Sequence, residues 1–179
     1  IIAEQISENE EARNMIRFNF KKDAVITSVK LKPKAKTNEE EQEWEQKAQK
    51  YRDYFQFSEK LARCASHRLL AMRRGEEEGF LRITISGDDE RCLDRLDKLF
   101  LKNSSRSAEL VWEAIEDGFK RLLKPSIETE FANLSKEQAD KEAIRIFVKN
   151  LEQLLMAAPL GQKRVLALDP GFRTGCKVV

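Results

Sequence analysis

The sequence predicts a mainly α-helical fold, a multi-helix scaffold with a small two-stranded β-ribbon, and it ends in a truncated β-hairpin. Charged residues make up 36% and hydrophobic residues 41% of its 179 residues, a composition typical of soluble, helix-rich chains. Apolar residues recur at helical spacing through most of the chain. Two internal segments, 24–31 and 80–86, alternate as strands do, and two short apolar runs flank a Pro-Gly turn in the final segment, 165–179.

The N-terminal part is predicted to form a helix, a strand and a second helix. Isoleucines among charged residues favour a helix over 1–19. Alternation over 24–31 places four side chains on one face of a strand, namely Val25, Thr27, Val29 and Leu31. Ile26 then points to the other face. Thr37 or Asn38 can cap the next helix, whose first turn is rich in glutamate, as the helix dipole prefers.

The middle of the chain is predicted to be helix, strand and helix. Ser66 opens a helical segment, and Gly79 closes it. The strand over 80–86 has Leu81, Ile83 and Ile85 on one face, and we expect it to pair with the strand over 24–31. Gly87 and the two aspartates after it start the next helix.

The last helices are predicted to be separate. A helix over about 105–124 meets Pro125, where we expect a kink or a restart. Ser135 to Gln138 matches a capping box before the clearest amphipathic run, 144–158. We therefore expect one helical region over 1–161 and the first hairpin of another domain over 162–179.

Composition and single residue types exclude several classes of protein. The net charge of +2 is too balanced to indicate nucleic-acid binding by itself. Three cysteines far apart fit a reducing cytoplasm, and the single histidine, His67, argues against a structural zinc site. No apolar run approaches the roughly 18 residues of a membrane span. No P-loop, dinucleotide-binding or zinc-protease motif is present, so we expect no cofactor and no metal. The cysteines lead us to expect a cytoplasmic location.

Asp169 is the one candidate for catalysis. It follows the apolar run Val165–Leu168, and a carboxylate at the end of a first strand is how metal-dependent nucleases of the RNase H-like class begin their fold. Because a hard cation needs several oxygen ligands, Asp169 alone is an incomplete site, and we expect the chain to be part of a longer protein. The alternative is that Asp169 caps the turn at Pro170 and Gly171.

Basic residues in two places are candidates for contacts with nucleic acid. The first group surrounds a proline and comprises Lys30, Lys32, Lys34 and Lys36. The second comprises Arg68, Arg73 and Arg74, and with Ser66 and His67 the start of this helix could bind a phosphate. The alternatives are a solvated linker for the lysines, and arginines paired with Glu76 to Glu78.

Aromatic residues near the second helix allow two interpretations. They are Tyr51, Tyr54, Phe55 and Phe57. Such side chains could form a platform on which bases stack. At this spacing we expect them to belong to the core instead.

Several segments together resemble the bacterial Tex proteins, which are transcription accessory factors. The segments are Tyr51-Arg-Asp-Tyr-Phe-Gln-Phe57, Ser66-His-Arg-Leu-Leu-Ala-Met-Arg-Arg-Gly-Glu76, Leu160-Gly161 and Leu168-Asp-Pro-Gly-Phe-Arg-Thr-Gly-Cys-Lys177. The resemblance covers essentially the whole chain, and its final segment is the most specific. It implies a helical N-terminal and central scaffold followed by the start of a YqgF/RuvC-like domain of RNase H-like fold, with Asp169 at the first acidic position of that domain.

The resemblance implies a function as well. We expect a non-catalytic helical scaffold that positions modules for nucleic acid, mostly outside this chain, with nucleic acid and RNA polymerase as candidate partners. Two alternatives stay open. In the first, the chain is part of a metal-dependent nuclease or resolvase with Asp169 as its first metal ligand. In the second, the chain is itself a module that binds nucleic acid directly.

Overall fold

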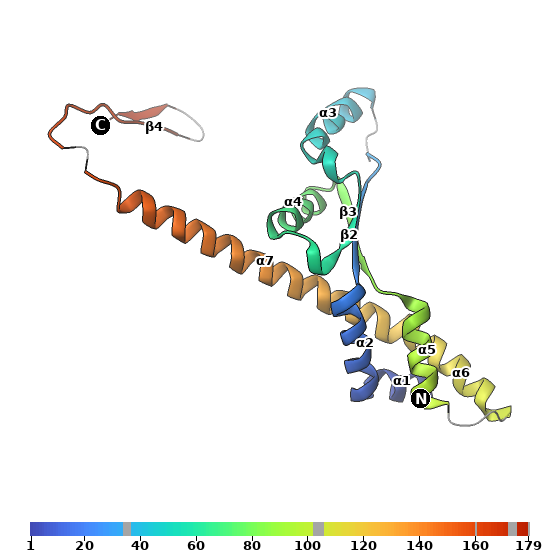
Figure 1. The fold of residues 1–179 in the computed structure, drawn as a ribbon. Coiled ribbons are helices and arrows are strands. Elements are labelled where there is room, and N and C mark those ends of the chain that lie inside the picture. The colour runs from blue at the N-terminus through green and yellow to red at the C-terminus, as the bar shows by residue number, and fades with distance from the viewer. Residues whose placement is uncertain (34–36, 102–105, 160, 172–174, 179) are drawn as a thin grey trace. The chain divides into compact units, whose positions relative to one another are not determined.

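A computed structural model describes residues 1–33, 37–101, 106–159, 161–171 and 175–178, and it confirms the mainly helical class (Figure 1). The elements are α1 (Ile2–Glu8), α2 (Glu10–Asp23), β1 (Val25–Lys30), α3 (Asn38–Ala48), η1 (Gln49–Tyr54), β2 (Gln56–Lys60), η2 (Leu61–Arg63), α4 (Ser66–Glu77), β3 (Leu81–Ser86), α5 (Asp89–Phe100), α6 (Arg106–Gly118), η3 (Phe119–Leu123), α7 (Lys124–Leu155), β4 (Leu168–Pro170) and β5 (Cys176–Val178). Elements η1 and η2 are 3₁₀ turns, whereas η3 is a π turn.

The chain forms two compact units, Ile1–Ile144 and Arg145–Val179. Within the first unit, α1, α2, α5 and α6 gather at one end of the sheet, and α3 lies at the other end (Figure 1). The division into domains expected after residue 161 stays a prediction.

The sheet of the first unit is antiparallel and has the strand order β2-β1-β3. The expected pairing of β1 with β3 is present, and Asp88 caps α5 by accepting a hydrogen bond from the backbone N–H of Arg91. The third strand, β2, was not predicted, so the expected two-stranded ribbon has three strands. Its five residues carry too few apolar side chains to indicate a strand, and pairing with β1 is what makes them one.

The buried face of β1 is the opposite of the expected one. Ile26 and Ser28 are fully buried, whereas 48% of Val29 is exposed. Register explains the difference, because Ile26 lies opposite Ile85 and Ser28 lies opposite Ile83. Residues directly opposite each other share a face, so the apolar face of β3 decides which face of β1 is buried.

The N-terminal helix predicted over 1–19 is two helices. Asn9 has an extended backbone, with φ −64° and ψ 122°, and its side chain accepts a hydrogen bond of 2.9 Å from the backbone N–H of Ala12. Asparagine competes with helical hydrogen bonds in this way, so it ends α1 and caps α2.

The helix break expected at Pro125 takes another form. The chain runs from α6 through η3 into α7, and the N–H of Lys124 bonds to the carbonyl of Phe119 across the wider π turn. Such a turn accommodates a proline, which has no N–H of its own to donate. The capping box at Ser135 is wrong, because Ser135 lies inside α7 and its hydroxyl donates to the Ala132 carbonyl at 3.0 Å.

The core of the first unit joins its helices to the sheet. Its largest fully buried apolar side chains are Ile16, Phe20, Ile26, Met72, Leu81, Leu96, Ile115, Phe119, Leu123 and Ile127. A smaller cluster contains Ala48, Tyr51, Phe80 and Leu81, and Trp44 packs against it. The π turn η3 therefore contributes two of the core side chains.

In the second unit β4 and β5 pair as an antiparallel hairpin in which Asp169 lies opposite Lys177. Apolar side chains of the amphipathic run predicted over 144–158 are exposed. Examples are Phe147 at 65% and Leu154 at 74%. The assignment of the hairpin to an RNase H-like domain stays a prediction.

Candidate nucleic-acid interface

Lys30, at the end of β1, is partly buried and its charge is paired. Its Nζ lies 2.6 Å from both carboxylate oxygens of Glu45. The same Nζ lies 4.9 Å from the ring centre of Phe55 and 5.5 Å from that of Trp44. A carboxylate and two aromatic faces therefore already satisfy this charge. Lys32 is exposed, and Lys34 and Lys36 lie outside the described residues.

Two of the three candidate arginines on α4 are paired as well. Arg68 Nη1 lies 3.0 Å from Glu59 Oε2 on β2, and Arg73 Nη1 lies 2.9 Å from Glu76 Oε2 one turn along the helix. Arg74 is exposed. Of this group, Arg74 is the residue that presents its side chain to solvent without an ion pair among the described residues.

The start of α4 does not favour an anion. The N-cap is Ala65, with no side-chain cap, and Ser66 is the first helical residue. The Ser66 hydroxyl bonds to the carboxylate of Glu142 on α7. A phosphate approaching the free N–H groups of this helix would meet that negative charge. His67 is exposed.

The aromatic residues pack in the core or against it, with Tyr51 buried and the other three partly buried. The Tyr51 ring centre lies 5.8 Å from that of Phe80, and Tyr54 packs edge-on against Phe57 at 5.7 Å. Only 4% of Tyr51 is exposed, and burial raises the pKa of its hydroxyl above the usual value. A ring so enclosed cannot stack on a base.

Asp169 is exposed in the middle of β4, and Pro170 follows it in the same strand. Across the described parts of the chain, no three side chains of His, Cys, Asp or Glu come close enough together to hold a metal ion. The role of Asp169 as a metal ligand stays a prediction.

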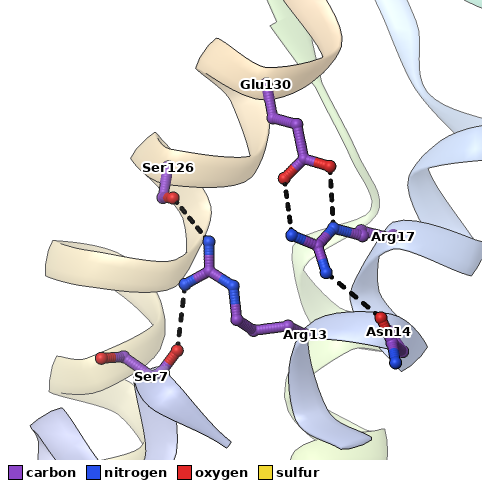
Figure 2. A network of polar contacts seen from close by, with 6 residues as sticks. All are labelled: Ser7, Arg13, Asn14, Arg17, Ser126 and Glu130. Atoms are coloured by element: carbon purple, nitrogen blue, oxygen red, sulfur yellow. Dashed lines mark hydrogen bonds and ion pairs between the residues drawn. The ribbon is translucent and has the colours of Figure 1, made fainter. Parts of the chain in front are cut away.

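The structure shows a polar network that the sequence did not indicate (Figure 2). Arg17 on α2 forms a bidentate ion pair with Glu130 on α7. Its Nε lies 2.8 Å from one carboxylate oxygen and its Nη2 lies 3.0 Å from the other. Arg13 donates to the Ser126 hydroxyl at 2.8 Å and to the Ser7 carbonyl at 3.1 Å. The partners in Arg13–Ser126 and in Arg17–Glu130 are 113 positions apart in sequence, so no spacing rule could have found these two contacts.

The charges of the two units differ in sign. Residues 145–179 contain six basic and two acidic residues, whereas acidic residues outnumber basic ones in residues 1–144. The candidate contacts for nucleic acid predicted above all lie in the first unit. A count of charges per unit would have pointed to the second.

A family model described as Tex central region-like matches residues 1–147. The chain belongs to this Tex family. It is 41% identical over 179 residues to an uncharacterised protein, YdcI, of Bacillus subtilis, covering 99% of this chain and 24% of that protein. It is 31% identical over 183 residues to the transcriptional accessory protein Tex of Neisseria gonorrhoeae, covering 99% of this chain and 23% of that protein.

The chain is also similar to the human S1 RNA-binding domain-containing protein 1, with 28% identity over 187 residues that cover 99% of this chain and 18% of that protein. The chain thus spans about a quarter or less of these relatives. Within the described ranges, none of the helices combines the length and the apolar character that crossing a membrane requires.

Proposed function

We propose that this chain is the non-catalytic helical scaffold of a Tex-type transcription accessory protein. In this role it positions modules that bind nucleic acid elsewhere in the complete protein, and it contacts nucleic acid or RNA polymerase only weakly. The family match and the names of two relatives, one a transcriptional accessory protein and one an S1 RNA-binding protein, support a role of this kind.

The observation that carries the proposal is the internal neutralisation of the candidate cations. Lys30, Arg68 and Arg73 each pair with a carboxylate of the same unit. Phosphate binding draws its strength from cations that release the counterions of the nucleic acid. A cation already paired with a carboxylate must first give up that partner, so these three cations offer a phosphate little net attraction.

The contacts between helices also suit a scaffold. Arg17 and Arg13 attach α2 to α7, while Lys124 on α7 pairs with Asp89 on α5. These contacts lie around a continuous apolar core. A unit tied together in this way can hold attached modules at fixed positions.

A binding titration across salt concentrations tests the proposal. Fluorescence anisotropy would compare this chain with the complete protein on single-stranded RNA and on duplex DNA, between about 50 and 200 mM salt. We expect the chain alone to bind with a Kd weaker than about 1 µM near physiological salt, and the complete protein to bind more tightly. Submicromolar binding by the chain alone would contradict the scaffold proposal.

A second candidate, direct binding of nucleic acid, is favoured by the basic excess in residues 145–179 and by the exposure of Lys32 and Arg74. Charge reversal at Arg145 and Lys149 tests the first group, and charge reversal at Lys32 and Arg74 tests the second. If either group binds phosphates, its reversal lowers affinity and flattens the dependence on salt. An unchanged slope in both variants rejects direct binding.

A further inference from the structure

The two edges of the three-stranded sheet differ in what covers them. On the β3 edge, the backbone N–H of Ile83 donates to Glu76 Oε1 at 3.1 Å. Arg73 holds the other oxygen of this carboxylate at 2.9 Å. A side chain of α4 therefore satisfies a donor of this edge strand, which is one way in which proteins block pairing with another chain.

The β2 edge is open. The backbone hydrogen bonds from Lys30 N to Phe55 O, at 3.0 Å, and from Leu61 N to Ala24 O, at 2.8 Å, show which residues of this strand face β1. Because the bonding direction alternates along an antiparallel strand, the N–H and C=O groups of the even-numbered residues point away from β1. These residues are Gln56, Ser58 and Lys60, and all three are exposed. In the described part of the chain, no hydrogen bond engages their backbone groups on that side.

An apolar groove begins where β2 ends. Its volume is about 650 Å³, and its lining includes Leu61, Leu69, Phe131, Leu134 and Ala139. Leu61 directly follows Lys60 in sequence, so one wall of the groove lies next to the end of the open edge. Half of Leu134 is exposed at the rim, where an apolar side chain of a ligand would cover it.

Unpaired positive charge lies beside the edge and the groove. Arg63 follows β2 in η2, and Lys21 lines the groove. Both are exposed, and neither forms an ion pair with any described carboxylate. The charges of β2 itself are already matched, because Glu59 pairs with Arg68 and Lys60 pairs with Asp23. Lys141 and Glu137 of the groove lining pair with each other, and Glu142, bonded to the lining residue Ser66, adds one carboxylate without an ion pair in the described part of the chain. Lys21 and Arg63 together still outnumber that one carboxylate, so a segment at the groove meets a small excess of cations.

From these three features we infer that the β2 edge binds an extended, acidic segment of a partner protein. The segment adds a fourth strand to the sheet through the backbone groups of Gln56, Ser58 and Lys60. An apolar side chain then enters the groove beside Leu61, and carboxylates next to it face Lys21 and Arg63. Backbone bonds give such strand addition its affinity, and the pocket and the charges give it specificity.

Peptide titrations test this inference. The probe is a blocked peptide of about ten residues in which valine and threonine alternate along a strand, followed by leucine and two aspartates. One comparison peptide has lysine in place of aspartate, and another carries N-methyl groups on alternate residues, which removes its edge donors. We expect each comparison peptide to bind at least about tenfold more weakly than the acidic probe.

Variants of the protein separate the backbone contribution from the charge contribution. Ser58→Pro removes an outward N–H and leaves the hydrogen bonds to β1 intact, so we expect at least about a tenfold loss of peptide affinity. Ser58→Thr keeps the N–H and is the matched control. The double variant K21E/R63E should lose affinity for the acidic probe and gain affinity for the lysine peptide, whereas Arg82→Glu on the exposed face of β3 should change neither.

Several results would overturn the inference. One is equal affinity of the protein for the acidic and the N-methylated peptides. Another is an unchanged affinity of K21E/R63E for the acidic probe, which can be measured even if Ser58→Pro does not fold. Competition by an RNA oligonucleotide would reassign the edge to nucleic acid. A concentration-dependent dimer, seen by sedimentation and not dissociated by the peptide, would reassign it to a second copy of the chain.

Discussion

Arg17 and Arg13 attach α2 to α7 by different contacts, as Figure 2 shows. Arg17 places two nitrogens against the two oxygens of Glu130, a geometry that lysine could not reproduce. Arg13 bonds instead to neutral oxygens on Ser126 and Ser7. The Arg17–Glu130 pair lies between two helices and is about one-third exposed, so water screens it less than a pair on an open surface.

Replacing Arg17 with glutamine tests the value of this attachment. We expect Arg17→Gln to lower the free energy of unfolding by about 1 kcal/mol, because Glu130 keeps a half-buried charge without its partner. Arg121→Gln is the matched control, since Arg121 on η3 forms the same bidentate pair with Asp117, four residues earlier on α6. Both side chains of this pair are exposed. The control should cost less than Arg17→Gln in urea unfolding, because solvent screens the exposed pair, and an equal cost would show that joining two helices adds nothing.

The pKa values of Glu128 and Glu137 are shifted in opposite directions, so we expect the two carboxyl groups to change the stability with pH in opposite ways. Burial raises the pKa of Glu128, although Lys124 opposes this, and the hydrogen bond from Lys141 lowers the pKa of Glu137. The folded protein therefore favours the protonated form of Glu128, and its contribution to stability is lost as the pH rises through the raised pKa. The contribution of Glu137 is present above the ordinary carboxyl pKa and is lost as the pH falls.

Urea unfolding of Glu128→Gln and Glu137→Gln checks these signs between about pH 3 and pH 7. Relative to the parent protein, Glu128→Gln should become more stable as the pH rises, because it removes a desolvated charge. Glu137→Gln should become less stable over the same range. Slopes of the same sign in both variants would contradict the assignment.

At the scale of elements, close approach decides how α1 packs on α6. A Cβ atom built on Gly118 would lie 2.9 Å from the backbone oxygen of Ala3, closer than real Cβ contacts. Glycine disfavours helices by about 1 kcal/mol relative to alanine, so its place at the end of α6 reflects this contact rather than helix propensity.

Gly118→Ala should therefore destabilise the protein, by about 1–3 kcal/mol in denaturant unfolding, because the backbone of α1 must move away. Asn133→Ala on the exposed side of α7 is the control, and it should be neutral or stabilising by a few tenths of a kcal/mol. A stabilising Gly118→Ala would show that α1 is not held against α6.

At the scale of the whole molecule, apolar residues of the two units play different parts. Leu123 is fully buried in the first unit, whereas 74% of Leu154 in the second unit is exposed. We expect Leu123→Ala to cost about 2–5 kcal/mol of unfolding free energy and Leu154→Gln to change it by less than about 0.5 kcal/mol. Calorimetry on both variants checks this, and a large loss in Leu154→Gln would show that this side chain is covered in solution.

Patterns local in sequence could be predicted. The helical class, the apolar face of β3, the cap at Asp88 and the pair Arg73–Glu76 all rest on residues a few positions apart. The capping box at Ser135 failed although its pattern was local, because α7 passes through it and the Ser135 hydroxyl bonds inside the helix instead.

The sequence by itself thus determined that the chain is mainly helical, that β1 and β3 pair and that the chain resembles the Tex family. Only the tertiary structure decided that Ile26 rather than Val29 is buried, that β2 completes the sheet, and that Glu45 and Glu59 neutralise Lys30 and Arg68. The physical reason is the separation in sequence of the residues that determine each feature. Helix periodicity and caps depend on neighbours in sequence, whereas strand faces and ion pairs between elements depend on which distant residues the packing brings together.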